Sequence, residues 1–162
     1  MGAGKSTVGR ALARQLGWQF VDLDHQIERI ARVTIPEIFG SYGEAGFRER
    51  EHAALSVLAT MPRAVISTGG GTFVQKQSRE LIQKTGTAVW LDPPFEVLWA
   101  RLSKSPKKRP LLSDREATHG LWAERCRVYE QARVRVSMQA EGSPDEVAEA
   151  VVARLKEQPC VF

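Results

Sequence analysis

The sequence has few cysteines, few aromatic residues and no long apolar run. Cys126 and Cys160 are the only cysteines among 162 residues, too few for a disulfide scaffold or a four-ligand zinc site. No apolar segment approaches the roughly 20 residues that cross a bilayer. Aromatic residues make up 7% of the chain and do not alternate with its basic run, as they would in a protein that stacks nucleic-acid bases. We therefore expect neither a membrane nor a nucleic-acid partner.

The net positive charge of the chain comes from one segment. The net charge is +4 overall, but residues 101–135 carry +6 and the remaining 127 residues carry −2. A basic balance is typical of nucleic-acid binders, membrane-surface proteins and enzymes that bind small anions. The 43% of apolar residues suffices for a packed core, so we expect a single domain over residues 1–162.

Helical and extended patterns alternate along the chain. The predicted helices cover residues 5–16, 26–31, 36–42, 44–58, 78–84, 95–102, 120–131 and 144–156. The predicted strands cover residues 19–22, 64–67, 88–91 and 134–138. This order predicts an α/β fold with a central parallel sheet and helices on both faces, whose ligands bind at the carboxyl ends of the strands. Residues 103–115 are expected to form a mobile loop.

A glycine-rich segment opens the first helix. Gly2-Ala3-Gly4-Lys5-Ser6-Thr7 matches the downstream part of the phosphate-binding motif G-x-x-x-x-G-K-[ST]. Its backbone N–H groups and the helix N-terminus attract phosphate oxygens, Lys5 would bridge the terminal phosphates, and Ser6 would supply a hydroxyl ligand to Mg²⁺. The alternative is a glycine turn before a helix.

The first glycine of that motif belongs five positions before Gly4, ahead of Met1. The strand expected before such a loop is missing as well, so we expect a sheet that lacks its first strand. We predict that Met1 is an internal methionine of a longer natural chain.

Two further motifs fall at the ends of predicted strands. Asp22 and Asp24 lie two positions apart, which places them on the same side of an extended chain. One could organise Mg²⁺ through water while the other accepts hydrogen bonds from a diol, although a solvated strand end would explain them too. Gly69-Gly70-Gly71 would let the backbone approach a ligand closely, or would be a flexible turn.

Arg48 and Arg125 are candidates for binding a carboxylate, because guanidinium pairs with carboxylate through two parallel hydrogen bonds. Glu51 lies one helical turn beyond Arg48 and could hold it in position, although the pair could also be a surface salt bridge. Phe47 could pack against an apolar ring of a ligand or belong to the core.

These motifs, in their order and spacing, resemble the shikimate kinase family over almost the whole chain. The motifs are Gly2–Thr7, Asp22–Asp24, Gly46-Phe47-Arg48, Gly69–Gly71, Arg109-Pro110-Leu111-Leu112, and Arg125 followed by Tyr129. The resemblance implies a P-loop kinase fold and transfer of the ATP γ-phosphoryl group to the 3-hydroxyl of shikimate, a step in aromatic amino-acid biosynthesis. It implies an acceptor-binding region at about residues 24–59.

The resemblance also assigns roles to single residues. It implies that Asp22 lies on the Mg²⁺ side, that Ser67 contacts Mg²⁺ through water, and that Asp24 contacts the acceptor and could draw off its proton. Arg109 lies in a lid at about residues 103–115, where a cation brought in by closure stabilises a metaphosphate-like transition state. Arg101 is a candidate for stacking on adenine. We expect a cytoplasmic, monomeric enzyme that uses ATP and Mg²⁺.

Two other functions stay open from the sequence. A related small-molecule kinase, such as a gluconate kinase, would not call for the acceptor motif formed by Asp24, Arg48 and Gly69–Gly71. A non-catalytic ligand-sensing domain of a regulator would be free to lose the Arg109 lid.

Overall fold

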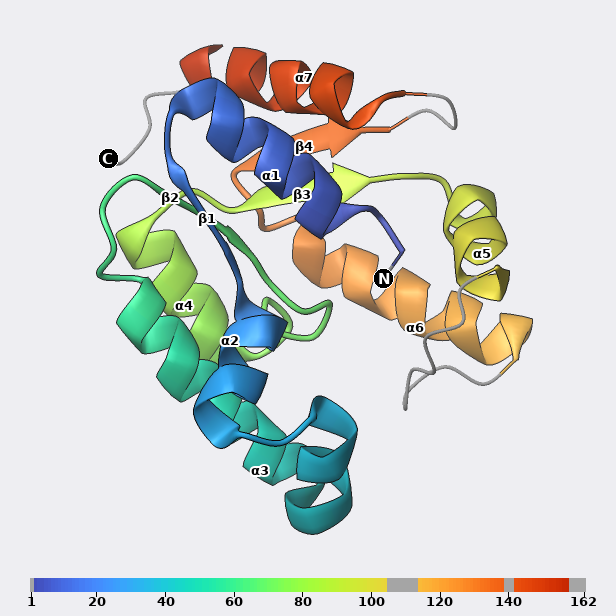
Figure 1. The fold of residues 1–162 in the computed structure, drawn as a ribbon. Coiled ribbons are helices and arrows are strands. Elements are labelled where there is room, and N and C mark those ends of the chain that lie inside the picture. The colour runs from blue at the N-terminus through green and yellow to red at the C-terminus, as the bar shows by residue number, and fades with distance from the viewer. Residues whose placement is uncertain (1, 105–113, 139–141, 158–162) are drawn as a thin grey trace.

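The computed structural model describes residues 2–104, 114–138 and 142–157. Its elements, in chain order, are α1 (Lys5–Leu16), β1 (Gln19–Asp22), α2 (Leu23–Ala31), α3 (Ile35–Leu58), β2 (Ala64–Ser67), α4 (Lys76–Thr85), β3 (Val89–Asp92), α5 (Phe95–Ser103), α6 (Arg115–Tyr129), β4 (Val134–Ser137) and α7 (Pro144–Glu157). The predicted alternation of helices and strands is therefore confirmed, and all four predicted strands are present (Figure 1).

The strands form two parallel pairs. β1 pairs with β2, with Gln19 opposite Ala64, and β3 pairs with β4, with Val89 opposite Val134. In the described part of the chain no hydrogen-bonded ladder joins the two pairs. An apolar cavity of about 1100 Å³ is lined by residues of both β2 and β3. The single central sheet of the sequence prediction is thus two half-sheets with a gap between them.

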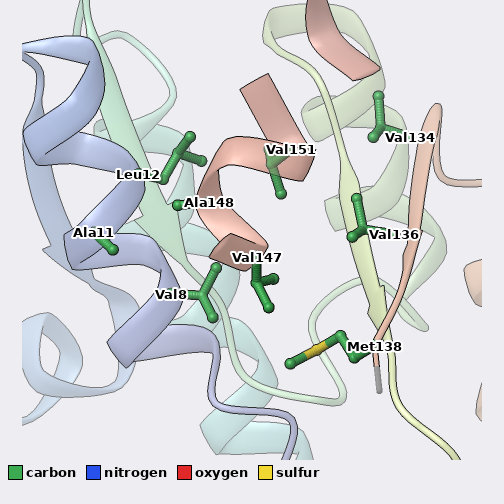
Figure 2. Packing of buried hydrophobic residues seen from close by; sticks show 9 residues of the cluster. All are labelled: Val8, Ala11, Leu12, Val134, Val136, Met138, Val147, Ala148 and Val151. Atoms are coloured by element: carbon green, nitrogen blue, oxygen red, sulfur yellow. The ribbon is translucent and has the colours of Figure 1, made fainter. Parts of the chain in front are cut away.

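Alternating residues of the strands face two helical layers. Val65 packs with the cluster of α1 and α7, whereas its neighbour Ile66 packs with the cluster of α2 and α3. This is the expected result of a side-chain period of two in a strand. Figure 2 shows the first cluster, in which Leu12 of α1 approaches Ala148 of α7 and Val8 of α1 approaches Val147 of α7. Helices therefore cover both faces of the strands, as the sequence predicts.

Two helices begin three or more residues earlier than the sequence pattern predicts. α2 begins at Leu23 rather than residue 26, because Asp22 is its N-cap and accepts a hydrogen bond from the backbone N–H of His25. α6 begins at Arg115 rather than residue 120, because Asp114 accepts a hydrogen bond of 2.8 Å from the N–H of Ala117. An acidic N-cap satisfies a helix donor that has no partner within the helix.

The predicted break at Gly43 is confirmed. α3 runs from Ile35 to Leu58, but Gly43 has φ 64° and ψ −171°, so the helix consists of two segments joined at this residue. A glycine adopts this conformation without the strain that a Cβ would introduce. Within residues 2–104, 114–138 and 142–157, no helix combines the length and the hydropathy that a membrane crossing requires.

Candidate active site

The phosphate-binding segment forms a tight turn that leads directly into α1. Gly2 has φ 61° and Gly4 has φ 77°, a left-handed conformation that other residues rarely adopt. Gly4 is the N-cap of α1, and the first turn of that helix contains no acidic residue. The helix N-terminus therefore presents its N–H groups and its positive dipole end with no carboxylate in its own first turn, which suits it to bind phosphate.

Three oxygen-bearing side chains meet beside this turn. The Ser6 hydroxyl donates a hydrogen bond of 2.6 Å to Oδ2 of Asp22, and it lies 3.3 Å from the hydroxyl oxygen of Ser67. Asp22 ends β1 and Ser67 ends β2, so the parallel strands bring both side chains to the same edge. Oxygen donors with one carboxylate fit Mg²⁺, which keeps several waters of its own. The described residues contain no cluster of three His, Cys, Asp or Glu side chains, which would be typical of a metal held by the protein alone.

Asp24 does not lie on an extended chain beside Asp22, as the sequence predicted. It lies in the first turn of α2, since the helix begins at Leu23. Its Oδ1 is 3.2 Å from the position that a Cβ on Gly69 would occupy. Asp24 nevertheless faces the glycine segment, because the N-terminus of α2 and the end of β2 lie at the same edge.

Arg48 is held by a buried network. Its Nη1 donates a hydrogen bond of 2.8 Å to Oε2 of Glu51, and Oε1 of Glu51 accepts one of 2.6 Å from Thr72. Glu51 is 1% exposed and Thr72 is fully buried. Burial by itself lowers the pKa of Arg48, but the hydrogen bonds and charges of Glu51 and Glu44 outweigh it, so the pKa is raised. The predicted pairing of Glu51 with Arg48 is confirmed.

Arg125 is the second guanidinium of the site and the more deeply buried of the two. It lies on α6 and is 8% exposed, and no residue within the described ranges forms a hydrogen bond or an ion pair with it. Burial raises the pKa of the neighbouring Tyr129 hydroxyl, while the positive charges of Arg125 and Arg48 act in the opposite direction. Both guanidinium groups therefore act on the same hydroxyl, which places them in one region although 77 positions separate them in sequence.

Tyr129 links this region to the glycine segment. Its hydroxyl donates a hydrogen bond to the carbonyl oxygen of Gly70. A Cβ built on Gly71 would lie 2.6 Å from Nη1 of Arg48 and closer still to Nη2. The absence of a side chain at Gly71 therefore gives the guanidinium of Arg48 room against the backbone.

The other predicted site residues differ in how the structure places them. Phe47 is 5% exposed and stacks on Phe39 at a centroid distance of 4.8 Å, so it belongs to the core. Nη1 of Arg101 donates a hydrogen bond of 3.4 Å to the carbonyl oxygen of Gly2, which puts Arg101 against the phosphate turn. Its stacking on adenine stays a prediction. Arg109 and most of the lid lie outside the described residues.

Sequence analysis missed three contributions to this site. Thr72 follows the three glycines directly, but nothing in a single sequence connects it with Glu51, 21 positions earlier. Tyr129 belongs to a recognised motif, yet its hydrogen bond to Gly70 spans 59 positions. Glu44 lies four residues before Arg48, a helical spacing that predicts the ion pair seen here at 3.0 Å.

Comparisons with known proteins agree on one family. The family model described as shikimate kinase matches residues 1–156. A shikimate kinase of Rhizobium leguminosarum bv. trifolii is 43% identical, over 97% of this chain and 83% of the relative. A shikimate kinase of Gloeobacter violaceus is 44% identical, over 97% of this chain and 91% of the relative.

Solved structures give the same result. The chain superimposes on the shikimate kinase of Acinetobacter baumannii, determined in complex with shikimate, with a TM-score of 0.91 and 37% sequence identity. The match covers 97% of this chain and 89% of that one. The shikimate kinase of Aquifex aeolicus matches with a TM-score of 0.84 at 37% identity, over 96% and 92% of the two chains.

Proposed function

Because this chain belongs to the shikimate kinase family, we propose that it transfers the γ-phosphoryl group of ATP to the 3-hydroxyl of shikimate, giving shikimate 3-phosphate. The reaction brings together two anionic substrates, the triphosphate of ATP and an acceptor that bears a carboxylate. The site offers a helix N-terminus for the phosphates, and the buried guanidinium of Arg125 with the partly buried one of Arg48 for the acceptor.

One observation supports the choice of shikimate as the acceptor. Arg125 is buried without a carboxylate partner among the residues that the structure describes, and it lies near Arg48. A buried charge is stable only when it is paired, so this guanidinium is suited to a ligand that brings a carboxylate. A neutral open-chain acceptor would leave it unpaired, and gluconate lacks the rigid ring that would hold its hydroxyl at a fixed distance from its carboxylate.

Different residues of the chain would bind the phosphates, the metal ion and the acceptor. The turn formed by Gly2, Ala3, Gly4, Lys5, Ser6 and Thr7 would bind the phosphates, with Lys5 at the terminal ones. Ser6 and Asp22 would hold Mg²⁺, with Ser67 acting through water. When bound, the ion would neutralise charge on the phosphate oxygens. Asp24 would accept the proton of the attacking hydroxyl, while Arg48, Arg125 and Gly69–Gly71 would fix the acceptor.

Positioning and electrostatics supply most of the catalysis in such a reaction, because the loose transition state needs little covalent participation by the protein. Arg109 would add positive charge when the lid closes over the phosphates. The use of Mg²⁺, the monomeric state and the cytoplasmic location stay predictions.

A coupled assay of ADP release tests this proposal. The purified chain should turn over with ATP and shikimate, and mass spectrometry of the product should show one added phosphoryl group. Gluconate in the same assay is the control and should give no turnover above the rate without acceptor. Turnover with gluconate and none with shikimate would contradict the proposal.

A further inference from the structure

The guanidinium of Arg48 contacts three different residues, each through a different set of its nitrogen atoms. Nη1 binds Glu51, and the end formed by Nη1 and Nη2 lies against the backbone of Gly71. The remaining edge, formed by Nε and Nη2, binds Oε1 of Glu44 at 3.3 Å and 3.0 Å. Two N–H groups side by side are the geometry in which arginine binds a carboxylate most specifically. Glu44 therefore already occupies a carboxylate-binding edge.

The two glutamates on Arg48 differ in how firmly they are held. The side chain of Glu51 is 1% exposed and accepts a second hydrogen bond from Thr72. If Arg48 moved away, the buried carboxylate of Glu51 would lose its ion-pair partner. The side chain of Glu44 is 53% exposed and forms no other hydrogen bond or ion pair within the described residues. An exposed pair at this spacing contributes little stability, because water solvates the separated charges well. Glu51 is thus a permanent partner and Glu44 an exchangeable one.

The backbone gives Glu44 a favourable place when it leaves Arg48. Gly43 interrupts α3, so Glu44 opens the second helical segment of that element. A negative charge is favourable in the first turn of a helix, where the N–H groups point toward it. Displacement from Arg48 therefore leaves the carboxylate in water at a helix N-terminus and not in an apolar environment.

From these contacts we propose that Glu44 acts as an internal substitute for the carboxylate of the acceptor, which must displace it from the Nε–Nη2 edge of Arg48. The inference rests on the proposed function, since it takes the acceptor to be a carboxylate. Its consequence is specificity: only a ligand whose anionic group binds Arg48 better than Glu44 does gains access to this edge. A ligand with a neutral group in that position leaves the Glu44–Arg48 pair intact.

Calorimetric titration of the protein without nucleotide tests the inference, with shikimate and its methyl ester as the two ligands. Glu44→Gln removes the competing charge, so the Kd for shikimate should fall by about two- to fivefold, the range expected for an exposed ion pair. The Kd for the neutral ester should stay the same in this variant. A helix that was merely disturbed by the substitution would change both values together.

Glu49→Gln is the matched control. Glu49 lies on the same helical segment and is exposed, it carries the same charge, and no hydrogen bond or ion pair to Arg48 is present. The Glu49→Gln variant should change the Kd for shikimate only by the long-range effect of removing one negative charge. An equal gain in both variants, or a Kd for shikimate that is unchanged or higher in Glu44→Gln, would overturn the inference. A wild-type protein that does not bind shikimate would instead remove the proposed function.

Discussion

The hydroxyl of Ser6 donates a hydrogen bond of 2.6 Å to the carboxylate of Asp22. Ser6 belongs to the first turn of α1 and Asp22 to the end of β1, so this contact joins the phosphate-binding turn to the carboxyl edge of the strands. Asp22 also caps α2 through its other oxygen. The same carboxylate therefore fixes the position of both helices at the site.

Asp22→Asn should impair the use of Mg²⁺ by the enzyme while largely preserving the fold. The amide keeps an oxygen for capping α2 but removes the negative charge, and loss of a residue that orients or holds a metal typically costs about 10- to 100-fold in affinity or activity. The Mg²⁺ concentration that gives half-maximal rate should rise accordingly. Asp145→Asn, on the exposed start of α7, is the control and should leave it unchanged. Identical Mg²⁺ curves for wild type and Asp22→Asn would contradict the assignment.

Gly71→Ala should weaken shikimate binding much more than ATP binding. The added Cβ would lie 2.6 Å from Nη1 of Arg48, so the guanidinium must move away from its position. The expected result is a KM for shikimate raised about tenfold or more, since displacing a charge-assisted hydrogen bond costs about 1.5–3 kcal/mol. Gly120→Ala in α6 meets nothing within 4 Å and serves as the control. Equal KM values for Gly71→Ala and wild type would show that Arg48 need not stay in place.

Tyr129→Phe should raise the KM for shikimate and leave kcat nearly unchanged. The substitution removes the donor that holds the carbonyl of Gly70, so the glycine segment loses one hydrogen bond that fixes its position. It removes no group that is assigned to the transferred phosphoryl. The free energy of unfolding should fall by about 1 kcal/mol, the typical net contribution of such a hydrogen bond. Tyr42→Phe, at an exposed tyrosine of α3, should change neither quantity. A lower kcat at constant KM would assign Tyr129 to the chemical step instead.

Thr72→Val should destabilise the protein by about 1–3 kcal/mol, because it leaves a buried oxygen of Glu51 without its donor. Chemical denaturation measures this difference, and Thr72→Ser should restore most of the stability by returning the hydroxyl. If the valine and serine variants were equally unstable, packing of the methyl groups and not the hydrogen bond would be responsible.

Arg109→Ala should lower kcat far more than it raises the KM for shikimate, because a cation that acts on the transition state contributes little to binding of the ground state. Steady-state kinetics at saturating ATP separates the two effects. A change in KM alone would remove Arg109 from the transition-state role.

Local patterns predicted the elements of this fold well. The ranges of α1, β1 and β2 agree with the sequence prediction, because apolar periodicity and glycine positions mark them clearly. The largest errors lie at helix starts that depend on an acidic cap, as at Asp22 and Asp114. The pattern consequently predicts extended chain at Asp24, whereas this residue lies in the first turn of α2.

Motif spacing identified the functional groups, but it did not predict the contacts that position them. Glu51 could be paired with Arg48 because both lie on one helix. The bond from Tyr129 to Gly70 and the bond from Thr72 to Glu51 depend on how distant segments pack. That Arg125 has no hydrogen-bond or ion-pair partner among the described residues is likewise visible only when its surroundings are known.

The pairing of Arg125 with the carboxylate of the acceptor is the central claim, and a comparison of two substrates in two proteins tests it most directly. The ratio of kcat/KM for shikimate to that for its methyl ester is measured in wild type and in Arg125→Ala. Since a hydrogen bond to a charged group contributes about 1.5–3 kcal/mol, the wild-type ratio should exceed that of the variant by about tenfold or more. Equal ratios in the two proteins would show that Arg125 does not recognise the carboxylate.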